Sequence, residues 1–213
     1  MAVIGILALQ GDFAEHKEMI EHLGEQAVLV KHAGQLADVD GLIIPGGEST
    51  TIAKLTTSQA KQDDIFDAIL CRAGAGMPIY GTCMGSIFLA RGIEGSTQGR
   101  LALMDITVRR NAFGPQKFSR EQSVTIAELG EHPFPLVFIR GPIITACGAG
   151  VQTLAKVEEG IVMARQGNLL VTAFHPELTG DQRVHRYFLD MVKNAKSSTT
   201  PFAWPTATCT ASV

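Results

Sequence analysis

A cysteine lies between two glycines in the stretch 81–85, which reads Gly-Thr-Cys-Met-Gly. The apolar run 77–80 precedes it and the apolar residues 87–90 follow it, which predicts a strand, a sharp turn and a helix. Glycines allow a tight turn with the thiol at its apex, where the start of the helix would favour the thiolate. The spacing is the thiol counterpart of the Gly-x-Ser-x-Gly nucleophile elbow. Cys83 is therefore a candidate nucleophile, and a buried structural cysteine is the open alternative.

A histidine and a glutamate follow the apolar stretch 169–174, where the sequence reads His-Pro-Glu. Extended backbone would place His175 and Glu177 on one side of the chain, and Pro176 favours such backbone at the residue before it. An imidazole beside a carboxylate is the base and orienting group that a cysteine nucleophile needs. A loop histidine next to a solvated glutamate is the alternative. The remaining histidines lack comparable neighbours in the sequence: His16, His22, His32, His132 and His185.

The stretch 45–49 reads Pro-Gly-Gly-Glu-Ser and also ends an apolar run. The backbone N–H groups of Gly46 and Gly47 could face an oxyanion, as an oxyanion hole requires. A Gly-rich turn into a helix that starts near Ser49 is the alternative. The spacing and the Lys-Ser/Thr pair of a phosphate-binding loop are missing.

The elements that must position these groups alternate between strands and helices in the first half of the chain. Strands are expected over 3–9, 27–30, 40–44 and 77–80, and helices over 12–24, capped by Asp12, and over about 62–72. This alternation predicts an α/β fold with a central, mostly parallel sheet flanked by helices. In such a sheet the functional groups gather at the carboxyl ends of the strands.

The second half reads as strands without helices between them, which predicts an antiparallel extension of the sheet. The expected strands are 106–108, 124–126, 137–139, 161–163 and 169–174, with hairpin turns at 158–160 and 166–168. A last helix over 181–196 completes a single domain spanning 1–196. The Ser/Thr/Pro-rich segment 197–213 is expected to be a flexible tail, with a docking segment as the alternative.

Composition narrows the function classes. The chain has 213 residues, of which 46% are hydrophobic, and this suits one packed domain. A net charge of -3 without a Lys/Arg cluster argues against a nucleic-acid partner. The four cysteines are too widely spaced for a zinc site or a disulfide framework, so we expect no metal and a reducing compartment. No apolar stretch approaches the ~20 residues of a membrane helix, and no secretory signal is apparent, so we expect a cytoplasmic protein without membrane contact.

The three motifs together resemble those of class I (triad) glutamine amidotransferases. A narrower resemblance, to the glutaminase subunits of pyridoxal 5'-phosphate synthase, covers most of residues 1–195. It rests on the stretches 9–11 (Leu-Gln-Gly), 46–51 (Gly-Gly-Glu-Ser-Thr-Thr), 110–114 (Arg-Asn-x-Phe-Gly), 138–142 (Phe-Ile-Arg-x-Pro) and 174–179 (Phe-His-Pro-Glu-Leu-Thr). The chain departs from this family at Met84, where a smaller residue is usual, at Gly141, which replaces alanine, and in its tail.

The resemblance implies that Cys83 attacks the side-chain amide of L-glutamine, releases ammonia and forms a glutamyl thioester that water hydrolyses. His175 would move the proton and Glu177 would orient the imidazole. The family's oxyanion hole maps to backbone N–H groups of Gly46, Gly47 and Met84. Its site for the amino-acid end of glutamine maps to Gly47, Glu48, Ser49, Arg110, Ile139 and Arg140.

Two adjacent arginines, Arg109 and Arg110, could supply the guanidinium that matches an α-carboxylate. We choose Arg110 because it aligns with the family's Arg-Asn-x-Phe-Gly stretch, and because neighbours in a strand point to opposite faces.

The resemblance also implies a partner. The family passes ammonia to a synthase subunit, which combines it with a pentose phosphate and a triose phosphate, so pyridoxal 5'-phosphate is a product of a hetero-oligomer and this chain needs no cofactor. We expect the isolated chain to be a weak glutaminase that becomes more active in complex with the synthase. The alternatives are a glutaminase for another synthase, as in histidine or anthranilate biosynthesis, a non-catalytic binding subunit with a vestigial triad, which the unusual Met84 motivates, and a redox-sensing cysteine protein.

Overall fold

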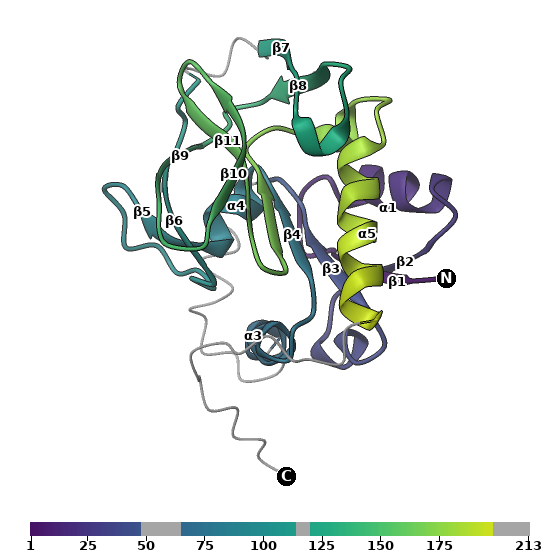
Figure 1. Ribbon diagram of the computed structural model, residues 1–213. Coiled ribbons are helices and arrows are strands. Elements are labelled where there is room, and N and C mark those ends of the chain that lie inside the picture. The colour runs from purple at the N-terminus through teal and green to yellow at the C-terminus, as the bar shows by residue number, and fades with distance from the viewer. Residues whose placement is uncertain (48–64, 114–119, 198–213) are drawn as a thin grey trace.

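The computed structural model describes residues 1–47, 65–113 and 120–197, and a large twisted sheet forms its centre (Figure 1). Its strands are β1 Val3–Leu7, β2 Gln26–Val30, β3 Gly41–Ile44, β4 Ile79–Thr82, β5 Ala90–Ile93, β6 Met104–Arg109, β9 Ile143–Cys147, β10 Gln152–Val157, β11 Gly160–Gln166 and β12 Leu169–Thr172. They pair in the order β2-β1-β3-β4-β12-β11-β9-β6-β5, with β10 beside β11. A separate antiparallel pair is formed by β7 Arg120–Val124 and β8 Phe134–Phe138.

Helices lie on both faces of the sheet. The helices of the described residues are α1 Phe13–His22, α3 Ile65–Gly74, α4 Met84–Leu89 and α5 Arg183–Ser197, with short 3-10 turns at η1 Ala33–Leu36, η2 Ala127–Leu129 and η3 Pro176–Leu178. Ile20 of α1 and Phe188 of α5 share one buried apolar cluster with the β7–β8 pair. Ile69 of α3 and Phe88 of α4 belong to the cluster on the other face. Because both faces are covered, strands β3, β4 and β12 are buried along their whole length.

The parallel part of the sheet brings four strand ends to one edge. β1, β3, β4 and β12 are parallel neighbours, and Thr82 at the end of β4 pairs with Thr172 at the end of β12. The loops that leave these ends begin at Ala8, Pro45, Cys83 and Ala173. They contain the three motifs singled out in the sequence, so the expected gathering at the carboxyl ends is observed.

The antiparallel extension lies beyond β12, as the sequence predicted. Hairpins join β10 to β11 and β11 to β12, and the terminal pairs Val157–Gly160 and Gln166–Leu169 confirm the turns expected at 158–160 and 166–168. Three strands were not expected: β5, which precedes this half, and β9 and β10 within it, and β7 ends at Val124, where the expected strand 124–126 begins. The sequences of the three unexpected strands mix polar and apolar residues without clear alternation, and the strand geometry comes from pairing with β6 and β11.

The fold class predicted from the sequence is confirmed. α5 ends at Ser197, one residue beyond the expected domain boundary, and the rest of the expected tail lies outside the described residues, as does the helix start expected near Ser49. The division at residue 196 therefore stays a prediction. Among the helices of the described residues, none is long and apolar enough to cross a membrane.

Candidate active site

Cys83 forms the apex of the turn between β4 and α4. Its own backbone takes φ 46° and ψ -103°, a conformation that non-glycine residues rarely adopt. The sequence suggested that the flanking glycines would make the turn, but they allow close packing instead. A Cβ at Gly81 would lie 2.6 Å from the Gly85 backbone, and a Cβ at Gly85 would lie 2.1 Å from the Ile44 carbonyl oxygen.

Hydrogen bonds hold the strained turn in place. The Cys83 N–H donates to the Thr172 carbonyl at 2.7 Å, which ties the turn to β12. The Ser86 hydroxyl donates to the Cys83 carbonyl at 2.6 Å. Cys83 is 7% exposed, so its thiol opens into the site without lying on the free surface. A strained residue that its surroundings hold so firmly is typical of a functional position.

His175 and Glu177 form a close pair, although the backbone differs from the expected extended geometry. β12 ends at Thr172, and residues 176–178 turn into η3. The 3-10 turn brings the Glu177 carboxylate back to its neighbour, so Oε1 lies 2.7 Å from Nδ1 of His175. The His175 N–H donates to the Val137 carbonyl at 2.9 Å, which fixes the residue against β8. This imidazole and carboxylate have the arrangement of a base and its orienting group.

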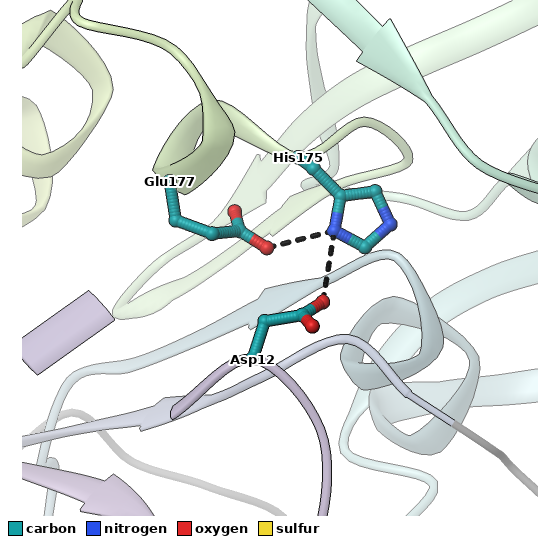
Figure 2. A group of neighbouring side chains, drawn as sticks. All are labelled: Asp12, His175 and Glu177. Atoms are coloured by element: carbon teal, nitrogen blue, oxygen red, sulfur yellow. Dashed lines mark hydrogen bonds and ion pairs between the residues drawn. The ribbon is translucent and has the colours of Figure 1, made fainter. Parts of the chain in front are cut away.

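Asp12 is a second carboxylate at the same ring nitrogen. It occupies the N-cap position of α1, as expected, but its side chain makes no capping hydrogen bond. Its Oδ2 lies 3.4 Å from Nδ1 of His175, and Figure 2 shows both carboxylates converging on that atom. Sequence reasoning missed this contact, because the only signal for Asp12 was its place directly after Gly11 in a loop expected at a strand end.

The contacts change the protonation of the pair. Burial alone would lower the pKa of His175, but the nearby Asp12, Cys83 and Glu177 side chains raise it to about 12. The hydrogen bond with His175 lowers the pKa of Asp12. Burial raises the pKa of Glu177, and the contact with His175 opposes that rise. His175 is therefore favoured as an imidazolium, and an imidazolium next to a thiol stabilises the thiolate.

The loop after β3 packs against the imidazole and leaves no room for a side chain. A Cβ at Gly46 would lie 2.5 Å from Cε1 of His175 and 3.2 Å from Oδ2 of Asp12. The Gly46 N–H donates to Oγ1 of Thr82 at 2.9 Å, so this group is already occupied. Of the backbone donors expected for an oxyanion hole, Gly47 and Met84 remain, and both line the pocket beside Cys83.

The pocket has a volume of about 300 Å³. Its described lining residues are Asp12, Gly47, Cys83, Met84, Ile87, Arg110, Asn111, Ile139, Arg140 and His175. Arg110, Ile139 and Arg140, all expected in the glutamine site, are thus brought together, whereas Glu48 and Ser49 lie outside the described residues. Oppositely charged groups, the Asp12 carboxylate and the two guanidinium groups, share this pocket.

Two lining loops have strained backbone at a non-glycine residue. Asn111 has φ 51° and Arg140 has φ 52°. The Ala112 N–H donates to the Gly141 carbonyl at 3.1 Å and joins these loops. A Cβ at Gly141 would lie 2.7 Å from the Ala173 carbonyl oxygen, so the departure from alanine at this position suits the packing of this chain.

Two histidines that the sequence left without neighbours lie directly behind the site. His16 and His185 are fully buried, and His16 Nδ1 lies 2.9 Å from His185 Nε2. The other ring nitrogen of His16 lies 3.1 Å from Oγ1 of Thr82 and 3.5 Å from Oε2 of Glu177. The partners of His16 are far from it in the sequence. The packing of α1 and α5 on one sheet face creates the contacts, and sequence spacing does not report it.

The carboxylates and the imidazole of Asp12, His175 and Glu177 have potential ligand atoms within 4.8 Å of one another. That spacing would let the three share a cation. However, both carboxylates approach the same ring nitrogen, and Nδ1 must carry a proton to donate to them. The geometry therefore suits an acid–base cluster better than a metal centre.

Comparison with known proteins identifies relatives over nearly the whole chain. A model of the SNO glutamine amidotransferase family matches residues 6–194. The "Pyridoxal 5'-phosphate synthase subunit PdxT" of Desulforamulus reducens is 53% identical over 191 residues, which are 90% of this chain and 100% of that protein. The protein of the same name from Pelotomaculum thermopropionicum is 52% identical over 88% of this chain and 93% of its own.

Solved structures agree with this result. A crystal structure of a glutamine amidotransferase superposes with a TM-score of 0.82 at 44% identity and covers 89% of this chain and 98% of its own. A putative GMP synthase component from Thermoplasma acidophilum, 16% identical, covers 92% of this chain and 96% of its own with a TM-score of 0.67, and shares the fold. From the matched range and the identity of its relatives, the chain belongs to the SNO glutamine amidotransferase family.

Proposed function

We propose that the chain is the glutaminase of a pyridoxal 5'-phosphate synthase, hydrolysing L-glutamine to L-glutamate and ammonia. The observation that carries the proposal is that a strained Cys83 and His175 line one pocket, while Glu177 pairs with Nδ1 of that imidazole. A structural cysteine would need neither the strained apex nor an imidazole raised to a pKa of about 12. The family membership supports the same reaction.

The first half of the reaction forms a thioester. The Cys83 thiolate attacks the carbonyl carbon of the glutamine side-chain amide, and the oxygen becomes an oxyanion, which N–H groups of Gly47 and Met84 would stabilise. His175 then gives its proton to the leaving nitrogen, the C–N bond breaks and ammonia departs. Glu177 keeps Nδ1 protonated and aims Nε2 at the reacting atoms.

The second half regenerates the enzyme. Water attacks the thioester carbon while neutral His175 accepts its proton, and the C–S bond breaks to give glutamate and the Cys83 thiolate. The imidazolium–thiolate pair is restored, and the new side-chain carboxyl group keeps the second proton of water until it ionises in solvent. The sum is glutamine plus water to glutamate, ammonia and one proton, which ammonia takes up as ammonium in water, so atoms and protons balance without a further reactant.

The charges of the pocket suit the amino-acid end of glutamine. Arg110 and Arg140 lie in the lining, and a guanidinium matches an α-carboxylate in charge and shape. Ile139 is 39% exposed and supplies an apolar wall. Glu48 and Ser49, which complete the proposed binding set with Gly47, remain assigned from the resemblance alone.

The relatives at 53% and 52% identity are named as subunits of pyridoxal 5'-phosphate synthase, and they support a hetero-oligomer in which the partner is the synthase subunit. Ammonia would pass to that partner, whose product would be pyridoxal 5'-phosphate. We place the complex in the cytoplasm, where reducing conditions keep a catalytic thiol available.

The test combines labelling and a coupled assay. A glutamine-analogue affinity reagent should label Cys83 alone among the cysteines, and glutamate release should rise when the synthase subunit of a close relative is added. Cys83→Ala should lose labelling and turnover, whereas Cys71→Ala, at an exposed position, should keep both. Glutamate release by Cys83→Ala at the wild-type rate would overturn the assignment.

A further inference from the structure

Two buried imidazoles, those of His185 and His16, form a row that leads to the His175–Glu177 pair. α1 and α5 pack against the same face of the sheet, and each contributes one fully buried histidine, His16 and His185 (Figure 1). His185 Nε2 lies 2.9 Å from His16 Nδ1, and His16 Nε2 lies 3.5 Å from Glu177 Oε2. The row therefore links α5 to the triad carboxylate through α1.

The far oxygen of that carboxylate needs a donor. Glu177 Oε1 accepts from His175, whereas Oε2 is buried and has no hydrogen-bond partner at ordinary distance among the described residues. A buried carboxylate oxygen without a donor is costly. His16 Nε2, at 3.5 Å, is the nitrogen positioned to supply one, and catalytic contacts that are long without substrate commonly tighten in the complex.

The direction of the hydrogen bonds follows from the atoms at each end. Burial holds the pKa of His16 well below its usual value and lowers that of His185 to about 3, so each neutral ring carries one proton. If His16 carried it on Nδ1, its Nε2 could still accept from the Thr82 hydroxyl, but Glu177 Oε2 would lack a donor, and His185 would bury an N–H at Nδ1 without a partner among the described residues. With both protons on Nε2, His185 donates to Nδ1 of His16, and His16 Nε2–H faces Glu177 Oε2. The one group left unpaired is then the bare Nδ1 of His185, which buries no N–H.

We propose that His16 is a positioning residue of the glutaminase site, whose Nε2–H holds Oε2 of Glu177 while His185 Nε2–H fixes its tautomer. The inference rests on the proposed function, since it concerns the same triad. Held at both oxygens, Glu177 cannot rotate away from Nδ1 of His175, and the imidazole stays aimed at Cys83. Thr82 Oγ1, 3.1 Å from His16 Nε2, ties the same nitrogen to the oxyanion loop through Gly46.

Two amide substitutions separate this role from simple packing. In His16→Gln the side-chain amide nitrogen reaches the position of Nε2 and can replace its N–H. In His16→Asn the shorter amide reaches only the position of Nδ1, which faces His185. We expect His16→Asn to lower kcat on the order of tenfold to a hundredfold with KM nearly unchanged, because the site is misaligned and substrate contacts are kept. His16→Gln should recover most of the loss. Equal kcat for the two variants, whether both low or both near wild type, would overturn the proposal.

A second readout needs no glutamine turnover. The rate at which iodoacetamide alkylates Cys83 at neutral pH, followed by mass spectrometry, reports the reactivity of this thiol beside His175. The alkylation rate should fall in His16→Asn and stay close to that of the wild type in His16→Gln. If wild-type protein shows no glutaminase activity, the proposed function fails, but the alkylation rates still decide whether His16 positions the triad.

Wild-type protein provides the test that no folding defect can obscure. Long-range proton–nitrogen NMR spectra, assigned with the His16→Gln and His185→Gln variants, should show both imidazoles as the Nε2–H tautomer. A proton on Nδ1 of His16 would reverse the donor and contradict the proposal. His185→Gln should keep its donor to His16 and lose less activity than His185→Leu, and equal losses would count against a role for the His185 N–H.

Discussion

Nδ1 of His175 is the atom on which the residue-scale chemistry depends. It faces Glu177 at 2.7 Å and Asp12 at 3.4 Å, and the two carboxylates differ in their surroundings. Glu177 is buried, whereas the Asp12 side chain is 37% exposed and lines the pocket. The geometry suits Glu177 as the group that orients the ring, while Asp12 adds negative charge to the pocket.

Replacing Asp12 by Asn should shift the upper limb of the pH profile of kcat/KM towards lower pH. The hydrogen bond with Asp12 is one of the interactions that raise the pKa of His175, so without the carboxylate the imidazolium loses its proton at lower pH. Solvent screening limits the size of the shift because Asp12 is partly exposed. Glu15→Gln, at an exposed position of the same helix, is the control and should leave the profile unchanged. An upper limb unmoved in Asp12→Asn would contradict the role.

The sequence predicted the residues whose chemistry is local and missed those whose contacts are tertiary. Cys83, His175 and Glu177 lie in short motifs at strand ends, so residue type and spacing were sufficient to name them as candidates, and the structure brings Cys83 and His175 into one pocket with Glu177 paired to His175. His16 and His185 lie 169 residues apart and meet only because α1 and α5 pack on one face. The positive φ of Cys83 was also missed, since glycines beside a turn normally take that role.

At the scale of elements, the site is made by loops that leave parallel strands in register. The loops after β1 and β3 touch, because a Cβ at Gly11 would lie 1.7 Å from the Gly46 carbonyl oxygen. The loop after β3 then touches the imidazole that follows β12. Close approach between these loops therefore fixes the imidazole on one side, against Gly46.

Gly46→Ala tests this packing. The φ of Gly46 lies outside the left-handed region, so alanine is tolerated by the backbone, but its Cβ would meet His175 Cε1 at 2.5 Å and push the ring aside. We expect kcat/KM to fall on the order of a hundredfold, because a misplacement of about 1 Å has effects of that size. The matched control is Gly34→Ala, where a Cβ meets nothing within 4 Å. Activity of Gly46→Ala within twofold of the wild type would contradict this prediction, because it would show that the loop moves to accommodate the added Cβ without displacing the imidazole.

The sequence predicted the helices and strands whose apolar residues recur at a regular spacing or form a continuous run. It did not predict the strands whose geometry depends on hydrogen bonding to a neighbouring strand. β1, β3, β4 and α5 carry their own signal, since the strands are short apolar runs and the helix repeats apolar residues on one face. β5, β9 and β10 have no such pattern, and β10 contains register shifts against β11. Their strand geometry depends on neighbours that lie far away in the sequence.

At the scale of the whole molecule, the imidazole row crosses the layer between the helices and the sheet. His16 on α1 and His185 on α5 are buried next to Tyr80 of β4. Burial lowers the pKa of both histidines and so favours their neutral forms, because a charged imidazolium would lose its hydration there. The packing of both helices is thereby linked to pH.

The free energy of unfolding should fall as the solution is acidified below about pH 6.5, the usual pKa of histidine. Burial lowers the pKa of His185 to about 3, so between these values the unfolded chain binds a proton at His185 that the folded chain does not. The free energy of unfolding therefore falls by about 1.4 kcal/mol per pH unit through His185.

Urea unfolding of wild type and His185→Leu from pH 7 to 4 measures this loss: the stability of wild type relative to the variant should decrease with acidification. The pKa of Glu177 is raised in the folded protein, so at pH values above the usual pKa of glutamate acidification stabilises the fold through this group. Glu177 is present in both proteins, and its effect therefore largely cancels in the difference between them. Parallel curves for the two proteins would show that His185 is protonated in the folded state.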